Sequence, residues 1–100
     1  MTIKLLDGRS YGGELLTVTD SNAVLLVGGR VATVPLGAVD YLSIRDLGAV
    51  EYAGGHARSP DRGQRAQRMA RYPYGMSADV TAALLAATSQ AAPDRLESKQ

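Results

Sequence analysis

The stretch that decides the fold is IKLLDGRSYGGELLTVTDSNAVLLV, residues 3–27. Its Asp7-Gly8 pair follows a segment of alternating apolar and polar residues and favours a two-residue hairpin turn, because both positions tolerate positive φ. Residues 9–19 are long for one strand, and Gly12-Gly13 within them permits the sharp bend that a barrel corner needs. Residues 23–27 are almost wholly apolar, which is typical of a strand buried on both faces. The stretch therefore predicts three strands, the second of them strongly bent.

The same pattern continues to residue 44 with two more strands. Gly28-Gly29-Arg30 predicts a turn, and residues 31–34 predict a fourth strand that ends at Pro35, which has no N–H to donate to a ladder. A tight step then leads into a fifth strand, residues 39–44. So short a sheet buries its apolar residues and its edges best by closing on itself. We therefore expect a mainly β fold, a small five-stranded, SH3-like barrel in a domain of residues 1–53.

The second half of the chain is too poor in branched apolar residues to close a core of its own. Residues 1–50 contain eighteen Val, Ile and Leu, whereas residues 51–100 contain four, together with eleven Ala. One hundred residues suffice for a single modest core. We therefore expect residues 54–100 to be a linker and helices that lean on the barrel or on a neighbouring subunit.

Two helices are predicted in this second half, each beginning at a capping serine. The first spans about residues 60–71, with Pro at its first position, and the second spans residues 77–92, before Pro93. The second helix carries one shallow apolar stripe, formed by Val80, Ala83, Leu84 and Ala87. From residue 94 the sequence predicts a polar tail.

The composition argues against several functions. Eleven basic and ten acidic residues give a net charge of +1, so binding to nucleic acid or to an anionic membrane has to come from a local patch. Without Cys there is no disulfide framework, thiolate metal site or thiol nucleophile. No segment resembles a signal peptide or a membrane span, which predicts a soluble cytoplasmic protein. His56 has no nucleophile or acid motif around it, so we expect no enzymatic activity, cofactor or metal site.

Two segments show a distinctive order of elements. In residues 4–26 a strand, an Asp-Gly turn, a bent Gly-containing strand, an acidic turn and an apolar strand follow one another. This order resembles the first motif of Sm and Sm-like (LSm) proteins. Residues 34–44, VPLGAVDYLSI, are similar to the second motif of that family, in which a fourth strand steps through a tight turn into a fifth. The resemblance covers residues 2–45 and implies a bent five-stranded barrel.

The resemblance also implies an assembly. In that family the edges of the fourth and fifth strands pair between subunits and close a ring of roughly five to eight copies around a pore. The oligomer interface that follows for this chain consists of Val31, Thr33, Val34, Tyr41, Leu42 and Ile44. Typical members hold RNA, often uridine-rich, at the pore through an Asn and an Arg-Gly pair. Here Val24 and Pro35-Leu36 stand at those positions, and Asn22 substitutes only if the turn is shifted by two residues.

One local concentration of basic residues remains. Residues 56–71 contain five Arg and a single acid, Asp61. Repeated around a ring, this segment can grip a phosphate backbone, while Tyr72 and Tyr74 stack on bases. The alternatives are a solvated helix face or ion pairs with a neighbouring subunit. The candidate RNA-binding residues are Asn22, Arg30, Arg62, Arg65 and Arg68.

Three functions are compatible with the sequence. The first is a ring of identical subunits that binds single-stranded RNA by backbone electrostatics. The second is a structural or assembly ring without RNA binding, such as a phage or accessory component, with a protein partner at the helix of residues 77–92. The missing base-reading residues favour it. The third is a swapped or dimeric barrel of the PRC type, suggested by Val34-Pro35-Leu36.

Overall fold

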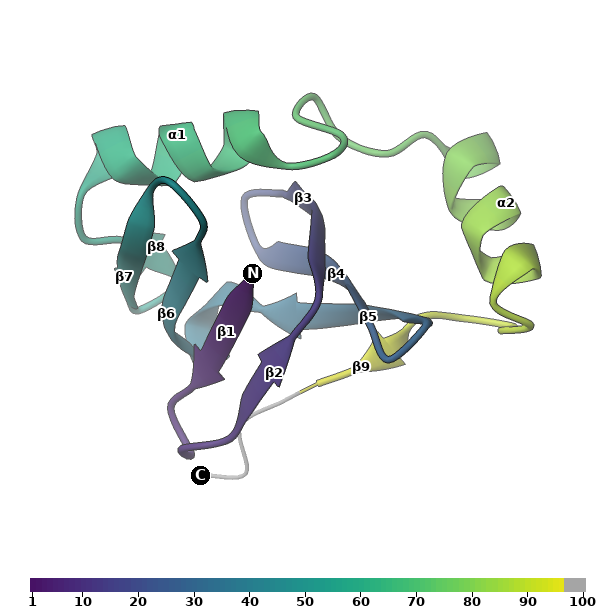
Figure 1. Ribbon diagram of the computed structural model, residues 1–100, viewed down its shortest axis with the longest axis horizontal. Coiled ribbons are helices and arrows are strands. Elements are labelled where there is room, and N and C mark those ends of the chain that lie inside the picture. Colours follow the sequence, from purple (N-terminus) through teal and green to yellow (C-terminus); the bar gives the residue numbers. More distant parts are fainter. Residues whose placement is uncertain (97–100) are drawn as a thin grey trace.

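The computed structural model describes residues 1–96, which form two β-sheets and two α-helices (Figure 1). The first sheet has the strand order β2-β1-β6-β7-β8 and the second the order β3-β4-β5-β9. The strands are β1 (Thr2–Leu5), β2 (Ser10–Gly12), β3 (Glu14–Val18), β4 (Asn22–Val27), β5 (Arg30–Pro35), β6 (Val39–Ile44), β7 (Gly48–Ala53), β8 (His56–Ala57) and β9 (Asp94–Arg95). The mainly β class is thus confirmed. In the part of the chain that is described, no ladder joins the two sheets into one closed barrel.

The predicted bent strand is divided between the two sheets. Its first half, β2, pairs with β1, and its second half, β3, pairs with β4. The chain passes from one sheet to the other at Gly13, where a Cβ atom would overlap the carbonyl oxygen of Leu26. Glycine is therefore required at this corner for steric reasons, because the backbone of β4 passes directly over it.

The core lies between the two sheets and is built mainly from the first half of the chain. Ile3, Leu5, Leu25, Val34 and Leu42 are completely or almost completely buried. Burying such an aliphatic side chain contributes about 1.5–3 kcal/mol each. A single 3-10 turn, η1 (Leu36–Ala38), connects β5 to β6 at the predicted tight step.

Helix α1 (Pro60–Met69) covers one end of the sheets (Figure 1). It begins as the sequence predicts, since the Ser59 hydroxyl accepts the Arg62 N–H at 3.4 Å and Pro occupies the first helical position. Ala66 and Ala70 enter the core cluster of the sheets. Small side chains at these two positions let the helix lie close to the strands.

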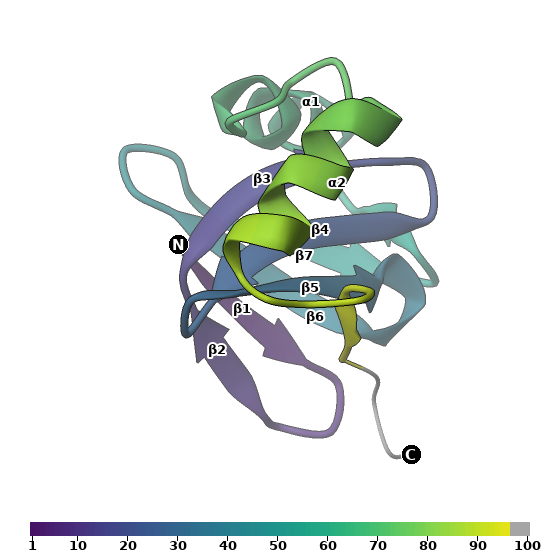
Figure 2. The same cartoon turned by 90° about the vertical axis from the view of Figure 1, so that its right-hand side faces the viewer.

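Helix α2 (Ala78–Ala87) lies beside the β3-β4-β5 sheet and contacts β5 (Figure 2). The predicted end at residue 92 was wrong, because Ser89 turns the chain with a φ of 59°. The Gln90 N–H then reaches the Leu85 carbonyl at 2.8 Å, and the Ser89 N–H reaches the Ala86 carbonyl at 3.2 Å. This is a Schellman motif whose left-handed position holds Ser in place of the usual Gly.

No residue of α2 is buried. Val80 and Leu84 of the predicted stripe are half-buried, but Ala83 and Ala87 are exposed. The inward face is completed by Thr81 and Leu85, so it is rotated from the predicted stripe and shares only Val80 and Leu84 with it. No helix within residues 1–96 has the length and apolar character needed to cross a membrane.

Candidate functional site

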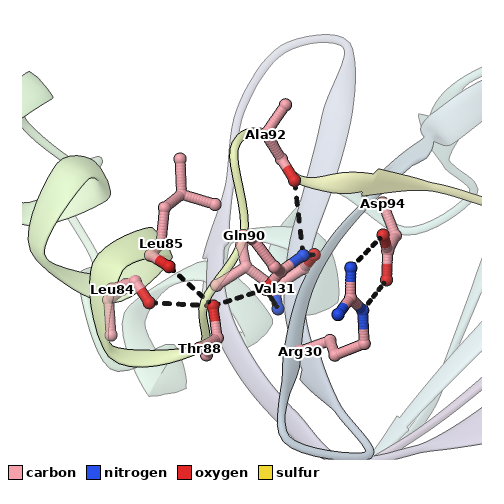
Figure 3. A network of polar contacts seen from close by, with 8 residues as sticks. All are labelled: Arg30, Val31, Leu84, Leu85, Thr88, Gln90, Ala92 and Asp94. Atoms are coloured by element: carbon pink, nitrogen blue, oxygen red, sulfur yellow. Dashed lines mark hydrogen bonds and ion pairs between the residues drawn. The ribbon is translucent and has the colours of Figure 1, made fainter.

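A buried glutamine, Gln90, covers the outer edge of β5. Its side-chain Oε1 accepts the Val31 N–H at 2.7 Å, and its Nε2 donates to the Val31 carbonyl oxygen at 2.9 Å (Figure 3). The Thr88 hydroxyl donates to the same Oε1 at 2.6 Å, and the Ala92 carbonyl accepts from Nε2 at 3.3 Å. A neighbouring strand would offer Val31 the same donor and acceptor from its backbone. The side chain of Gln90, a residue only 8% exposed, therefore acts as one rung of a strand ladder.

Beyond Gln90 the chain continues along the same edge. Strand β9 pairs with β5 in parallel, with Asp94 opposite Ala32 and Arg95 opposite Thr33. The Leu96 N–H then donates to the Thr33 carbonyl oxygen at 2.9 Å. We call residues 90–96 the C-terminal strap. The polar tail predicted from residue 94 was therefore wrong for residues 94–96, and its residues 97–100 lie outside the described part of the chain.

An ion pair fastens the strap to the beginning of β5. Arg30 donates from Nε to Asp94 Oδ2 at 2.7 Å and from Nη2 to Oδ1 at 3.0 Å (Figure 3). The hydrogen bonds and charge of Arg30 hold the pKa of Asp94 below its usual range, and Asp94 in turn raises the pKa of Arg30. The two side chains are 51% and 42% exposed, so solvent screens the pair. Its bidentate geometry contributes selectivity for this partner more than stability.

The predicted oligomer interface does not form a free edge. Val31, Thr33 and Val34 lie on β5, whose outer edge carries the strap. Tyr41, Leu42 and Ile44 lie on β6, which has β1 on one side and β7 on the other. Two segments that the resemblance did not include, β7 and the strap, thus occupy the edges that the resemblance assigns to contacts between subunits.

The five candidate RNA-binding residues lie on three different elements, and most are already engaged. Arg30 is paired with Asp94, and Arg65 on α1 is 3.2 Å from Asp61 of the same helix. The Arg62 guanidinium donates to the carbonyl oxygens of Leu47 at 2.6 Å and Ala49 at 3.0 Å, and so fastens α1 to the β6-β7 hairpin. The Asn22 side chain donates to Ser21, its neighbour in the turn before β4. Arg68 alone of the five makes no side-chain hydrogen bond or ion pair in the described residues.

Arg68 shares a shallow surface depression with an aromatic side chain. The depression has a volume of about 360 Å³ and is lined by Gln64, Gln67, Arg68, Pro73 and Tyr74. Tyr74 is 99% exposed, which is unusual for a tyrosine. This is the one part of the predicted RNA-binding segment where a free guanidinium and a free ring lie together. The other tyrosine, Tyr72, has Arg71 at 5.6 Å from its ring centre, and Arg71 is paired with Glu14.

Other chemistry-bearing groups do not form a site. No group of three or more His, Asp or Glu residues close enough to hold a metal occurs in residues 1–96. His56 is exposed at the start of β8. The hydroxyl of Thr17 is buried without a hydrogen-bond partner at the irregularity between β3 and β4, a position inside the sheet.

The strap is the feature of the candidate site that the sequence does not predict. Gln90 lies 59 residues after the Val31 that it binds, and Asp94 lies 64 residues after Arg30. A glutamine among alanines has no local signature for pairing with a distant strand. The chain matches no protein-family model, no curated protein and no solved structure.

Proposed function

We propose that this chain is a non-catalytic protein-interaction domain whose recognition edge is β5. The observation that carries the proposal is the strap: Gln90, Asp94 and Leu96 make on β5 the contacts of an added strand. Addition of an extended segment to a sheet edge is a recurrent mode of protein recognition, in which backbone bonds give affinity and side chains give selectivity. Here Arg30 supplies the selectivity, because two N–H groups of its guanidinium can donate to the two oxygens of a carboxylate.

We further propose that the fold is related to the Sm-like barrel. The second strand is bent at Gly13 and shared between two sheets, and η1 links β5 to β6 by a tight step. In this relationship β5 and β6 correspond to the fourth and fifth strands that pair between subunits. Assembly through those strands requires that β7 or the strap move. The strap is the more easily displaced of the two, since β7 buries Val50 and Tyr52 in the core.

A peptide-binding experiment tests the proposed function. The full chain with Gln90→Ala is titrated into a fluorescent peptide that carries residues 88–96, and binding is followed by anisotropy. We expect saturable binding that is at least tenfold tighter than that of the unmodified chain, in which the strap occupies the edge. A peptide with Asp94→Lys serves as the matched control and should bind weakly. Equal failure of both peptides with the opened chain would refute a strand-binding edge.

Binding of single-stranded RNA is a second candidate, favoured by the depression that Arg68 and Tyr74 share. A guanidinium beside an exposed ring suits a phosphate next to a stacked base. We expect an Arg68→Ala, Tyr74→Ala double variant to lose affinity for a U-rich oligonucleotide. An Arg58→Ala variant, which removes one guanidinium away from the depression lining, is the charge control. Absence of binding at low salt by the unmodified chain excludes this function.

A further inference from the structure

We infer that two copies of this chain exchange their C-terminal straps, each laying residues 90–96 along the β5 edge of the other. The inference rests on the proposed function, because it needs a β5 edge that accepts a strand from another molecule. It names the partner as a second copy. Three features of the structure lead to it, and they concern the edge, the connecting segment and helix α2.

The β5 edge is built for this particular segment. The side-chain amide of Gln90 provides both an acceptor and a donor for the backbone of Val31. The Leu96 N–H provides a donor for the Thr33 carbonyl oxygen. The Asp94 carboxylate provides the partner of the Arg30 guanidinium. None of these contacts depends on the strap belonging to the same chain. A second copy carries the same strap, so it satisfies the edge as well as the first does.

The segment that joins the strap to the sheets does not force it to stay within one molecule. Its last anchor on a sheet is the Tyr72 N–H, which donates to the Leu16 carbonyl at 2.7 Å. From residue 73 to residue 89 no side chain is buried, and the hydrogen bonds of residues 74–89 are made within residues 72–90. Gly75 adds a backbone position with a φ of 95°. The segment can therefore reach a neighbour without breaking contacts to the sheets other than the few made by α2.

Helix α2 supplies the reason for two copies to associate. Eight of its ten residues, ADVTAALLAA, are Ala, Val or Leu, and its single charge is Asp79. A helix that is apolar on all sides is normally buried, yet no residue of α2 is. In the exchanged dimer we place the two α2 helices against each other, so that the exposed Ala82, Ala83, Ala86 and Ala87 of one cover those of the other. An unrelated protein segment would satisfy the edge but would bring no second α2.

A charge-exchange experiment tests the inference. Arg30→Asp places two carboxylates at the strap ion pair of one chain, and Asp94→Arg places two guanidinium groups at the ion pair of the other. The two variants are mixed, refolded together at low salt and measured by native mass spectrometry. In this mixture the β5 edge of each variant meets an opposite charge only on the strap of the other variant. We expect the mixed dimer to exceed the two single-variant dimers by at least tenfold over the statistical ratio. The Arg30→Asp, Asp94→Arg double variant restores the pair on every chain and should behave as the unmodified protein does.

Two outcomes overturn the exchange. One is a mixture that contains only monomers, as does the unmodified protein at the same concentration. The other is a set of dimers in the statistical ratio, since it means that the dimers do not use Arg30 and Asp94. If the opened chain with Gln90→Ala still binds the strap peptide in either case, the exchange inference fails and the proposed function stands. If the peptide does not bind either, both fail.

Discussion

Replacing Gln90 by Ala should open the C-terminal strap without unfolding the sheets. The variant leaves the Val31 N–H and carbonyl oxygen without the bonds of 2.7 and 2.9 Å that they have in the native protein. A buried backbone group left unsatisfied costs about 1–3 kcal/mol, and two such groups lower the free energy of strap opening by about 2–6 kcal/mol. At about 1.4 kcal/mol for each factor of ten, the ratio of open to closed straps rises roughly 30- to 20,000-fold. The population of the open strap stops rising once nearly every molecule has an open strap.

Amide hydrogen exchange measured by NMR reads this opening directly. Protection of the Val31 amide should fall by the factor given above, whereas that of Leu25 in the central strand β4 should change little, because β4 is paired on both sides. Thr88→Val is the control: it removes the 2.6 Å hydroxyl contact to Gln90 but keeps both bonds to Val31, so protection should fall about tenfold or less. Unchanged protection of the Val31 amide in the Gln90→Ala variant would show that the Gln90 side chain does not hold the strap on the β5 edge. An equal loss in every strand would show that the strap is not an independent unit.

Three further predictions concern the fold. Gly13→Ala should lower the free energy of unfolding by about 3 kcal/mol in urea denaturation, because the new Cβ overlaps the Leu26 backbone. Gly12→Ala is the control and should cost under about 1 kcal/mol, because its Cβ would lie 3.8 Å from the Met1 carbonyl oxygen. Equal effects of the two variants would contradict the steric requirement for glycine at position 13. Ser89→Gly should stabilise the end of α2 by about 1 kcal/mol, since glycine adopts the φ of 59° without strain, and an unchanged thermal midpoint would argue against the left-handed cap. Burial raises the pKa of Tyr52 above its ordinary value of 10.0, so this residue ionises first in the unfolded chain. The contribution of Tyr52 to stability is therefore constant below about pH 10 and falls as the pH rises further. Tyr52→Phe should reduce this alkaline loss, as measured by urea denaturation at pH 9 and pH 11.

The strands of residues 2–44 could be predicted because their signals are local, whereas β7, β8 and β9 lie beyond the five predicted strands. Asp7-Gly8, the Gly12-Gly13 bend and Pro35 each mark a turn, a corner or a strand end within a few residues of where it occurs. Ser59 and Ser77 likewise cap the two helices at the predicted positions. In each case the residue that predicts the turn, strand end or helix start is the residue that forms it, so hydrophobic periodicity and turn chemistry are sufficient to predict these elements.

The features that escaped prediction depend on contacts between distant residues or on an unusual residue at a familiar position. The early end of α2 uses Ser89 where glycine is the usual signal, so the sequence pattern predicts a helix that continues to residue 92. The strap joins the last residues of the described chain to β5 across about sixty positions, and no local pattern records such a pairing. The sequence leaves open whether the arginines of α1 bind RNA, face solvent or form ion pairs; in the structure Arg62 holds a hairpin and Arg65 pairs within its own helix.

The separation of 59 residues between Val31 and Gln90 also has a consequence during synthesis. A ribosome adds about 5–20 residues per second, so roughly 3–12 seconds pass between the addition of Val31 and that of Gln90. Throughout that interval the nascent chain has a β5 edge and no strap to cover it. The order of synthesis thus leaves the β5 edge open to other strands until the strap of its own chain has been made.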